Sequence, residues 1–305
     1  MPGGLLAVHA HPDDETLSTG ALLATWAAAG RPVTVVTCTR GEQGEVIGAA
    51  LAALEGDGPA LAAHREGELA RALAALGVGD HVFLDHAGPG PAGRYVDSGM
   101  AWVGVSQAAA GEVLPDDAFV RVDLDEAAGR LAAVIRERRP DVVVGYEPGG
   151  GYGHPDHVRA HEVVHRAVAL AAEAAGGAEG HLVPVLLWSV VEEARLRRGY
   201  RAVAGRAVDG LEAPDPDGPV PSCAVTRADL AVDVVPVLPA VLGALRAHGT
   251  QVQAVQPGPG VGEVLASYAL SDAVVKPLLG TESYRRAPHR THAPVVWPTG
   301  VTPVA

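Results

Sequence analysis

The sequence predicts an α/β fold: a Rossmann-like, mostly parallel sheet with helices on both faces, plus a smaller C-terminal region. Strand-like and helix-like segments alternate through the first half of the 305 residues, and this order is typical of a parallel sheet covered by helices. Polar, histidine-containing segments directly follow two of the strand-like segments. Hydrophobic residues make up 48% of the chain, which lies within the range of globular proteins.

The elements of the first half follow one another in a regular order. Short apolar or β-branched runs predict strands, and apolar residues three and four positions apart predict helices. Strands are expected at residues 5–9, 32–39, 82–84 and 141–146, and helices at residues 20–29, 64–76, 126–138 and 156–175. In sheets of this kind ligands bind beyond the carboxyl ends of the strands, so functional residues are expected there.

Two long segments interrupt this alternation. Residues 86–119 are rich in Gly and Pro and follow a predicted strand, a position where a loop could contact substrate, although a plain surface loop would have the same composition. Residues 204–221 are expected to form an exposed connection. Glycines near residue 178 predict a division into a Rossmann-like domain, residues 1–178, and a C-terminal region, residues 179–305. We expect the second part to pack on the first and to help close the substrate site.

Charge and cysteine content exclude several classes of partner. Lys plus Arg number 23 and Asp plus Glu number 36, a formal net charge of −13, which argues against nucleic-acid or anionic-membrane binding. Two cysteines, Cys38 and Cys223, form no disulfide framework, and no signal peptide or apolar run of about 18 residues is evident. We therefore expect a cytoplasmic protein, either a monomer or a homodimer.

Two short motifs predict a metal centre. The first strand runs into the sequence HPDDE at residues 11–15, and a later strand runs into GYGHPDH at residues 151–157. Two histidines and one carboxylate would make a three-ligand site with an open position, which is typical of a catalytic zinc. Groups left over could act as a general base or stabilise oxyanion charge. Residue spacing alone does not choose among the six candidates, which are His11, Asp13, Asp14, His154, Asp156 and His157.

Two other metal motifs compete with this interpretation. Residues 161–165 match the HExxH pattern of helical zinc proteases, but no clear third ligand follows, so we interpret the match as coincidence. His11, Asp13 and His157 also have the spacing of an iron-oxygenase triad, a chemistry that usually occurs in antiparallel β-folds. Zinc is therefore favoured, although two histidines and one carboxylate can also bind Fe²⁺.

These motifs resemble a known family. Residues 8–15 (VHAHPDDE) and 151–157 (GYGHPDH) are similar to the two defining blocks of the LmbE/PIG-L-type zinc-dependent sugar N-deacetylases. Within that family, residues 37–48 (TCTRGEQGEVIG), 65–78 and 97–101 (DSGMA) are similar to the actinobacterial enzymes that deacetylate N-acetylglucosaminyl-inositol in mycothiol biosynthesis. The likeness is strong over about 175 residues and thins beyond them, with HGTQV at residues 248–252 as one further match.

The resemblance implies a role for each matching residue. One zinc ion per chain would be bound by His11, Asp14 and His157. Asp13 would be the general base and would then protonate the leaving amine. His154, tuned by Asp156, and Tyr152 would stabilise the oxyanion. Residues expected to contact the sugar-inositol substrate are Arg65, Asp97, Glu45 and Met100.

Two alternative functions share parts of this pattern. A mycothiol S-conjugate amidase would use the same fold and metal site, and the sequences GEVIG at residues 44–48 and GYG before His154 favour the deacetylase over it. A non-catalytic metal- or sugar-binding module would not need Asp13, His154 and Tyr152 together. The sequence thus predicts hydrolysis of the acetamide of the glucosaminyl-inositol to give the free amine and acetate.

Overall fold

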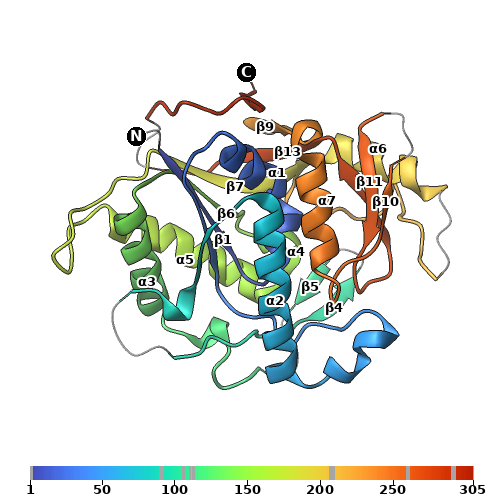
Figure 1. Cartoon of the computed structure of the whole chain (residues 1–305), viewed down its shortest axis with the longest axis horizontal. Helices are drawn as coiled ribbons and strands as arrows, with labels where there is room; N and C mark the ends of the chain where they lie inside the picture. Colours follow the sequence, from blue (N-terminus) through green and yellow to red (C-terminus); the bar gives the residue numbers. More distant parts are fainter. Residues whose placement is uncertain are drawn as a thin grey trace.

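A computed structural model describes residues 3–88, 93–104, 107–109, 111, 114–205, 210–258, 262–289 and 293–304. Within this part of the chain, a nine-stranded sheet runs through the centre of the molecule in the order β14-β9-β13-β7-β6-β1-β2-β3, and β8 pairs with β7 (Figure 1). Its strands are β1 (Gly4–His9), β2 (Val33–Thr37), β3 (Asp80–Phe83), β6 (Pro140–Tyr146), β7 (Val185–Glu192), β8 (Ala224–Val225), β9 (Leu230–Asp233), β13 (Thr281–Arg286) and β14 (Val301–Pro303).

The half of the sheet that carries the motifs is parallel. β1 lies between β2 and β6 and runs parallel to both, and β6 is also parallel to β7. β13 pairs antiparallel with β7 and β9, and β14 pairs antiparallel with β9. The predicted mostly parallel sheet is therefore confirmed, with an antiparallel extension at one edge.

Helices cover both faces of the sheet because each strand alternates its side chains between two cores. In β1, Leu5 and Ala7 belong to one buried cluster, and Leu6 and Val8 belong to the other. Residues from α1 (Asp14–Ala28), α2 (Gly58–Leu76) and α7 (Leu238–Ala247) complete the first cluster, and residues from α3 (Leu124–Arg138) and α5 (Pro155–Ala171) complete the second. Both sets of helices are visible in Figure 1.

A smaller antiparallel sheet is formed by the C-terminal part of the chain. It consists of β10 (Gln253–Pro257), β11 (Val264–Ala269) and β12 (Val275–Leu279), and α6 (Glu193–Ala204) packs against β12. Gly199 of α6 permits this contact, since a Cβ there would lie 2.8 Å from side-chain atoms of Leu279 and Pro277. The arrangement agrees with the predicted smaller C-terminal region.

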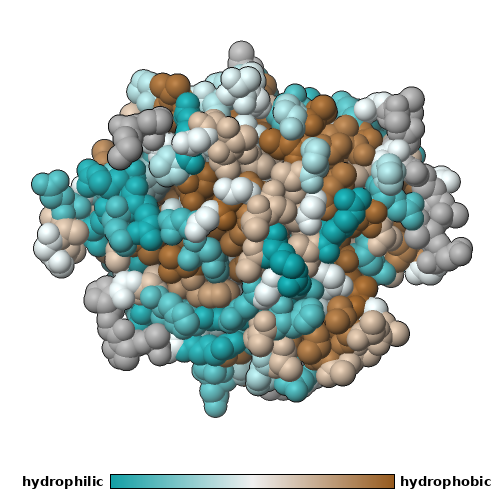
Figure 2. Space-filling view, viewed as in Figure 1, coloured by the Kyte–Doolittle hydropathy of each residue, from teal (hydrophilic) through white to brown (hydrophobic). Residues whose placement is uncertain are grey.

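Short elements make up the remaining connections. The expected loop at residues 86–119 contains a hairpin of β4 (Ala101–Gly104) and β5 (Gln107–Ala109), and parts of that loop and of residues 204–221 lie outside the described residues. The 3₁₀ helix η1 (Ala49–Leu54) buries none of its residues and forms the apolar corner at the lower right of Figure 2. The other short helices are η2 (Leu84–His86), η3 (Phe119–Arg121), α4 (Gly150–Gly153) and η4 (Val235–Val237).

Most predicted elements match the observed ones to within a few residues, and two helices begin earlier than expected. The helix expected from residue 20 begins at Asp14, because the carbonyl of Asp13 accepts the N–H groups of Thr16 and Leu17 and so starts the first turn. The helix expected from residue 64 begins at Gly58, where the Asp57 side chain caps it by accepting the N–H of Ala60.

The division expected near residue 178 stays a prediction. Four strands after that position, β7, β9, β13 and β14, belong to the same sheet as β1 and β6.

Among the described helices, none combines the length and the apolar character needed to cross a membrane.

Candidate metal centre and active site

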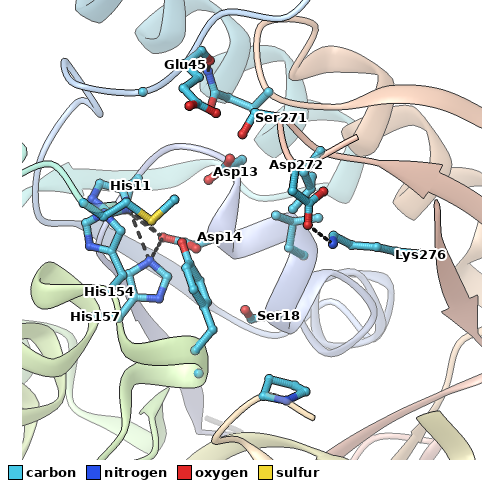
Figure 3. A pocket seen from close by; sticks show the side chains of 18 of the residues that line it. His11, Asp13, Asp14, Ser18, Glu45, His154, His157, Ser271, Asp272 and Lys276 are labelled. Atoms are coloured by element: carbon cyan, nitrogen blue, oxygen red, sulfur yellow. Dashed lines mark hydrogen bonds and ion pairs between the residues drawn. The ribbon is translucent and has the colours of Figure 1, made fainter. Parts of the chain in front are cut away.

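The two predicted motifs meet in one cavity of about 360 Å³ beyond the carboxyl ends of β1 and β6 (Figure 3). β1 ends at His9 and leads into the first motif, and β6 ends at Tyr146 and leads into the second. Because these neighbouring strands are parallel, their following loops lie side by side. Ten of the eleven residues that we expected in the site line the cavity. The eleventh, Asp156, contacts His11 Nε2 at 3.2 Å.

Three of the expected side chains form a compact triangle of ligand atoms. His11 Nδ1 lies 3.4 Å from Asp14 Oδ2, His157 Nε2 lies 3.3 Å from the same oxygen, and the two nitrogens are 3.3 Å apart. Bonds of about 2.0–2.1 Å to a tetrahedral ion place its ligand atoms about 3.3–3.4 Å from one another. The donor chemistry and spacing of this triangle therefore fit a four-coordinate metal with one open position.

His11 also belongs to two other groups of candidate ligands among the described residues, one with His154 and His157 and one with Asp97 and Asp156. Its second nitrogen, Nε2, lies 3.2 Å from Asp156 Oδ2 and 3.5 Å from Asp97 Oδ1. A metal-binding histidine commonly donates its other ring N–H to a carboxylate. This pattern favours Nδ1 as the ligand atom, with the two carboxylates orienting the ring.

Opposing charges control the protonation of this triangle. Burial alone would lower the pKa of His11, but the carboxylates of Asp97, Asp14 and Asp156 raise it well above its usual value. Burial alone would raise the pKa of Asp14, but His157 and His11 hold it well below its usual value. The same attraction favours an ionised Asp14, which suits a metal ligand, and a protonated His11, whose ring proton a bound metal would displace.

The contacts of Asp156 differ from the expectation that this residue tunes His154. Its carboxylate accepts the N–H and the hydroxyl of Ser98 at 2.9 and 2.5 Å and contacts His11. Its link to His154 is through the backbone, where the Asp156 N–H donates to His154 Nδ1 at 3.1 Å as part of the N-cap of α5. Because Nδ1 of His154 accepts this hydrogen bond, a neutral His154 ring carries its proton on Nε2. Burial lowers the pKa of His154 well below the usual value.

Asp13 has a strained backbone. Its φ of 123° lies in the left-handed half of conformational space, which residues other than glycine rarely adopt and which is often found at functional sites. Its carboxylate oxygen Oδ2 lies 3.5 Å from Arg65 Nη2. Burial raises the pKa of Asp13 to about 6, although Arg65 opposes the shift. A carboxylate of this kind is a suitable general base near neutral pH.

The four residues expected to contact substrate, Arg65, Asp97, Glu45 and Met100, all line the cavity. Two of them also make internal contacts. Arg65 is 2% exposed and donates to the carbonyls of Gly41 and Pro12 at 2.9 and 2.5 Å. Asp97 accepts the backbone N–H of Gly99 at 2.8 Å. These contacts fix the positions of both side chains before any ligand binds.

Tyr152 lies on α4, whose glycines let the loop approach the ligands. Gly150, Gly151 and Gly153 have φ of 65°, 81° and 96°, and a Cβ on Gly150 would lie 2.8 Å from His157 Cβ. The Tyr152 ring stands nearly perpendicular to that of His157, with centroids 5.0 Å apart. The loop therefore presents Tyr152 to the same cavity as the metal ligands.

Several cavity residues were missed by sequence reasoning. Tyr146 stacks on His157 at a centroid distance of 4.4 Å. The wall opposite the histidines comes from the C-terminal half and carries an ion pair between Lys276 Nζ and Asp272 Oδ2 at 2.5 Å (Figure 3). Local sequence gives no metal- or catalysis-like signal for these residues; only the status of Lys276 as the single lysine marks it. Other cavity residues from the C-terminal part of the chain are Ser189, Tyr200, Cys223, Gln251, Tyr268, Leu270 and Ser271.

The HExxH histidines point elsewhere, as the sequence interpretation anticipated. His161 Nδ1 lies 2.8 Å from the carbonyl oxygen of Tyr146, and His165 Nε2 accepts the indole N–H of Trp188 at 3.0 Å. Neither histidine lines the cavity. The candidate metal groups found in the described part of the chain all contain His11 instead.

Comparison with known proteins agrees with this geometry. Residues 6–168 match the family model PIG-L, described as GlcNAc-PI de-N-acetylase. A protein of Kineococcus radiotolerans named 1D-myo-inositol 2-acetamido-2-deoxy-alpha-D-glucopyranoside deacetylase is 46% identical over 291 residues, covering 93% of this chain and 77% of the relative. A Rhodococcus erythropolis protein of the same name is 45% identical over 285 residues, covering 92% of this chain and 89% of the relative.

One solved structure supports the fold. The 4-carboxy-2-hydroxymuconate hydratase GalB from Pseudomonas putida superposes with a TM-score of 0.54 at 18% sequence identity, covering 97% of this chain and all of that one. At this identity the likeness concerns the fold, not the reaction.

Proposed function

Because this chain belongs to the PIG-L family of de-N-acetylases, we propose that it hydrolyses the acetamide of 1D-myo-inositol 2-acetamido-2-deoxy-α-D-glucopyranoside. The products are acetate and the free amine, a step of mycothiol biosynthesis. The observation that carries the proposal is the placement of a strained, half-buried Asp13 beside the triangle of His11, Asp14 and His157 in one cavity. Relatives that bear this substrate in their names match more than nine-tenths of the chain.

The cofactor that best fits the ligand set is one Zn²⁺ per chain, bound by His11, Asp14 and His157. Fe²⁺ also accepts two histidines and one carboxylate. Either ion, when bound, polarises a carbonyl oxygen and lowers the pKa of water, in the case of zinc from about 15.7 to about 7. Asp97 and Asp156 would keep the His11 ring in the orientation that this binding needs.

The side chains around the triangle supply proton transfer and charge stabilisation. The Asp13 carboxylate accepts a proton from the attacking water and returns it to the leaving nitrogen, so that the C–N bond breaks with release of the amine. The Nε2–H of neutral His154 and the hydroxyl of Tyr152 donate to the carbonyl oxygen as it gains negative charge. Loss of one such donor typically lowers kcat about 10²–10³-fold.

The hydroxyl groups of the sugar and inositol rings would be held by Arg65, Asp97 and Glu45, with Met100 beside them. The C-terminal region contributes the opposite wall of the cavity, including Lys276, which supports the expectation that this region helps to close the site. We further propose a cytoplasmic enzyme that acts as a monomer or homodimer on this small molecule, with no nucleic-acid or membrane partner.

Two variants test these roles. Asp13→Ala should lower kcat about 10²–10⁴-fold while retaining a full complement of metal, and near-normal turnover would exclude Asp13 as the base. His157→Ala should lose the metal, as measured by elemental analysis of the purified protein. His161→Ala, which removes a histidine of the same helix outside the cavity, is the matched control and should keep it.

Substrate choice is tested by amine release from N-acetylglucosaminyl-inositol beside a mycothiol S-conjugate, using the zinc-loaded protein. A clear preference for the first substrate is expected. A preference for the second would identify an S-conjugate amidase on the same metal site. Metal binding without turnover of either substrate would identify a non-catalytic binding module and would refute the enzymatic proposal.

A further inference from the structure

The strained conformation of Asp13 is held by both sides of one peptide group. The carbonyl oxygen of Pro12 accepts a hydrogen bond from Arg65 Nη2 at 2.5 Å, and the N–H of Asp13 donates to Glu15 Oε2 at 2.9 Å. The orientation of this peptide plane sets φ of Asp13. A relaxed conformation with negative φ would turn the plane away from one or both partners.

Glu15 is completely buried, although it is not a candidate ligand or base. Its second oxygen, Oε1, accepts a hydrogen bond from His248 Nε2 at 2.7 Å and one from the Thr16 hydroxyl. A buried carboxylate without such partners is strongly destabilised. His248 therefore holds the Glu15 carboxylate in the position where its other oxygen accepts the Asp13 N–H.

His248 is itself fixed in place by the C-terminal half of the chain. It is 0% exposed and directly follows α7. Two residues later, Thr250 donates its N–H and hydroxyl to the Glu68 carboxylate of α2 at 2.8 and 2.6 Å, and its carbonyl accepts the N–H of Ile47 at 2.9 Å. The imidazole is thus delivered to Glu15 by a segment 233 residues away in sequence.

We propose that Glu15 and His248 are positioning residues that hold Asp13 in its strained conformation and so aim its carboxylate into the cavity. The proposal rests on the proposed role of Asp13 as the general base. Neither Glu15 nor His248 lines the cavity, so their effect on the reaction passes through Asp13. Without the Glu15 acceptor, the peptide plane turns, φ relaxes, and the carboxylate leaves its place.

The first test is a set of His248 variants of the full chain loaded with zinc. His248→Leu replaces the imidazole with an apolar side chain of similar size and removes the N–H that donates to Glu15. We expect kcat to fall about 10–100-fold, because a displacement of about 1 Å can lower a rate by about 10²-fold. KM should change by less than about twofold and the metal content should stay the same. His248→Gln, which supplies an N–H at similar reach, should recover kcat to within about fivefold.

A matched control separates this effect from general loss of packing. His181 is also buried, and its Nε2 bonds to the carbonyl of Pro140 at the opposite end of β6. His181→Leu should leave kcat within about twofold of the wild type. If His248→Leu does not fold, His248→Asn, whose shorter amide cannot reach Glu15, takes its place with the same expected loss. An equal kcat for His248→Gln and for the variant that lacks the N–H donor, His248→Leu or His248→Asn, would refute the proposal.

A double-mutant cycle gives the decisive measurement. In an Asp13→Ala background, adding His248→Leu should change the residual kcat by less than about twofold, because a residue that acts through Asp13 has nothing left to position. A further 10–100-fold loss in that background would show that His248 acts independently and would overturn the proposal. Near-normal turnover of Asp13→Ala alone would instead overturn the base assignment, so the two failures are distinguishable.

Discussion

The strain at Asp13 gives an inverted order of stability for two substitutions. Asp13→Ala and Asp13→Gly both remove the carboxylate, so they differ only in the Cβ. At most positions the glycine variant is the less stable of the two, because glycine loses more conformational freedom on folding. At Asp13, where φ is 123° and ψ is −33°, we expect the glycine variant to be the more stable.

The size of the difference follows from two opposing effects. A residue with a Cβ in such a conformation is destabilised by about 1–3 kcal/mol, which Asp13→Gly relieves and Asp13→Ala retains. The extra conformational entropy of glycine in the unfolded chain opposes this by about 0.5–1 kcal/mol. The net expectation is that Asp13→Gly is about 1 kcal/mol more stable, equivalent to roughly 2 °C in Tm for a chain of this length.

The assay is thermal or urea-induced unfolding of both variants in the same metal-loaded state. Ala70→Gly serves as the reference for an unstrained position, since Ala70 is exposed on α2, and this substitution should lower stability by about 1 kcal/mol. The reasoning fails if Asp13→Gly is less stable than Asp13→Ala by a similar amount, because Asp13 would then adopt its conformation without strain.

Three further predictions concern one histidine outside the cavity and two residues beside the proposed metal ligands. Burial and nearby histidines lower the pKa of His165 to about 4. The contribution of neutral His165 to the free energy of unfolding is therefore fully present above pH 6.5 and is lost as the pH falls towards 4. An NMR titration midpoint near 6.5 in the folded protein would contradict this. Gly150→Ala should weaken metal binding about 10–100-fold, because the new Cβ would lie 2.8 Å from His157 Cβ; an unchanged metal dissociation constant would exclude this contact. Asp156→Asn should weaken metal binding by a similar factor by removing the charged partner of His11 Nε2, and an effect on kcat alone would place Asp156 on His154 instead.

The sequence was sufficient to predict much of the parallel sheet and the side chains that surround the metal triangle. Both depend on local signals: apolar runs mark β1 and β6, and the HPDDE and GYGHPDH motifs stand directly after them. Because neighbouring parallel strands end at one edge, local motifs become spatial neighbours without further information. Sequence reasoning therefore placed His11 and His157 in one cavity.

The C-terminal contribution could not be predicted in this way. β8, β9 and β14 have two, four and three residues, too few to show a periodic pattern. The contact between His248 and Glu15 spans 233 positions, and nothing near either residue indicates the other. The start of α1 at Asp14 was also missed, because polar ligands after a strand were interpreted as a loop although they form the first helical turn.

Local motifs and distant contacts both determine the surroundings of Asp13. The three residues of the proposed metal triangle all precede residue 178, whereas the imidazole that supports Glu15 follows it. β7, which follows residue 178, also pairs directly with β6, the strand that delivers His154 and His157. A chain divided at residue 178 would therefore keep every ligand in its sequence while losing the neighbour of β6 and the partner of Glu15. The two parts are thus in contact through both the sheet and the Glu15–His248 pair, so the C-terminal half supports the Asp13 peptide as well as forming a wall of the cavity.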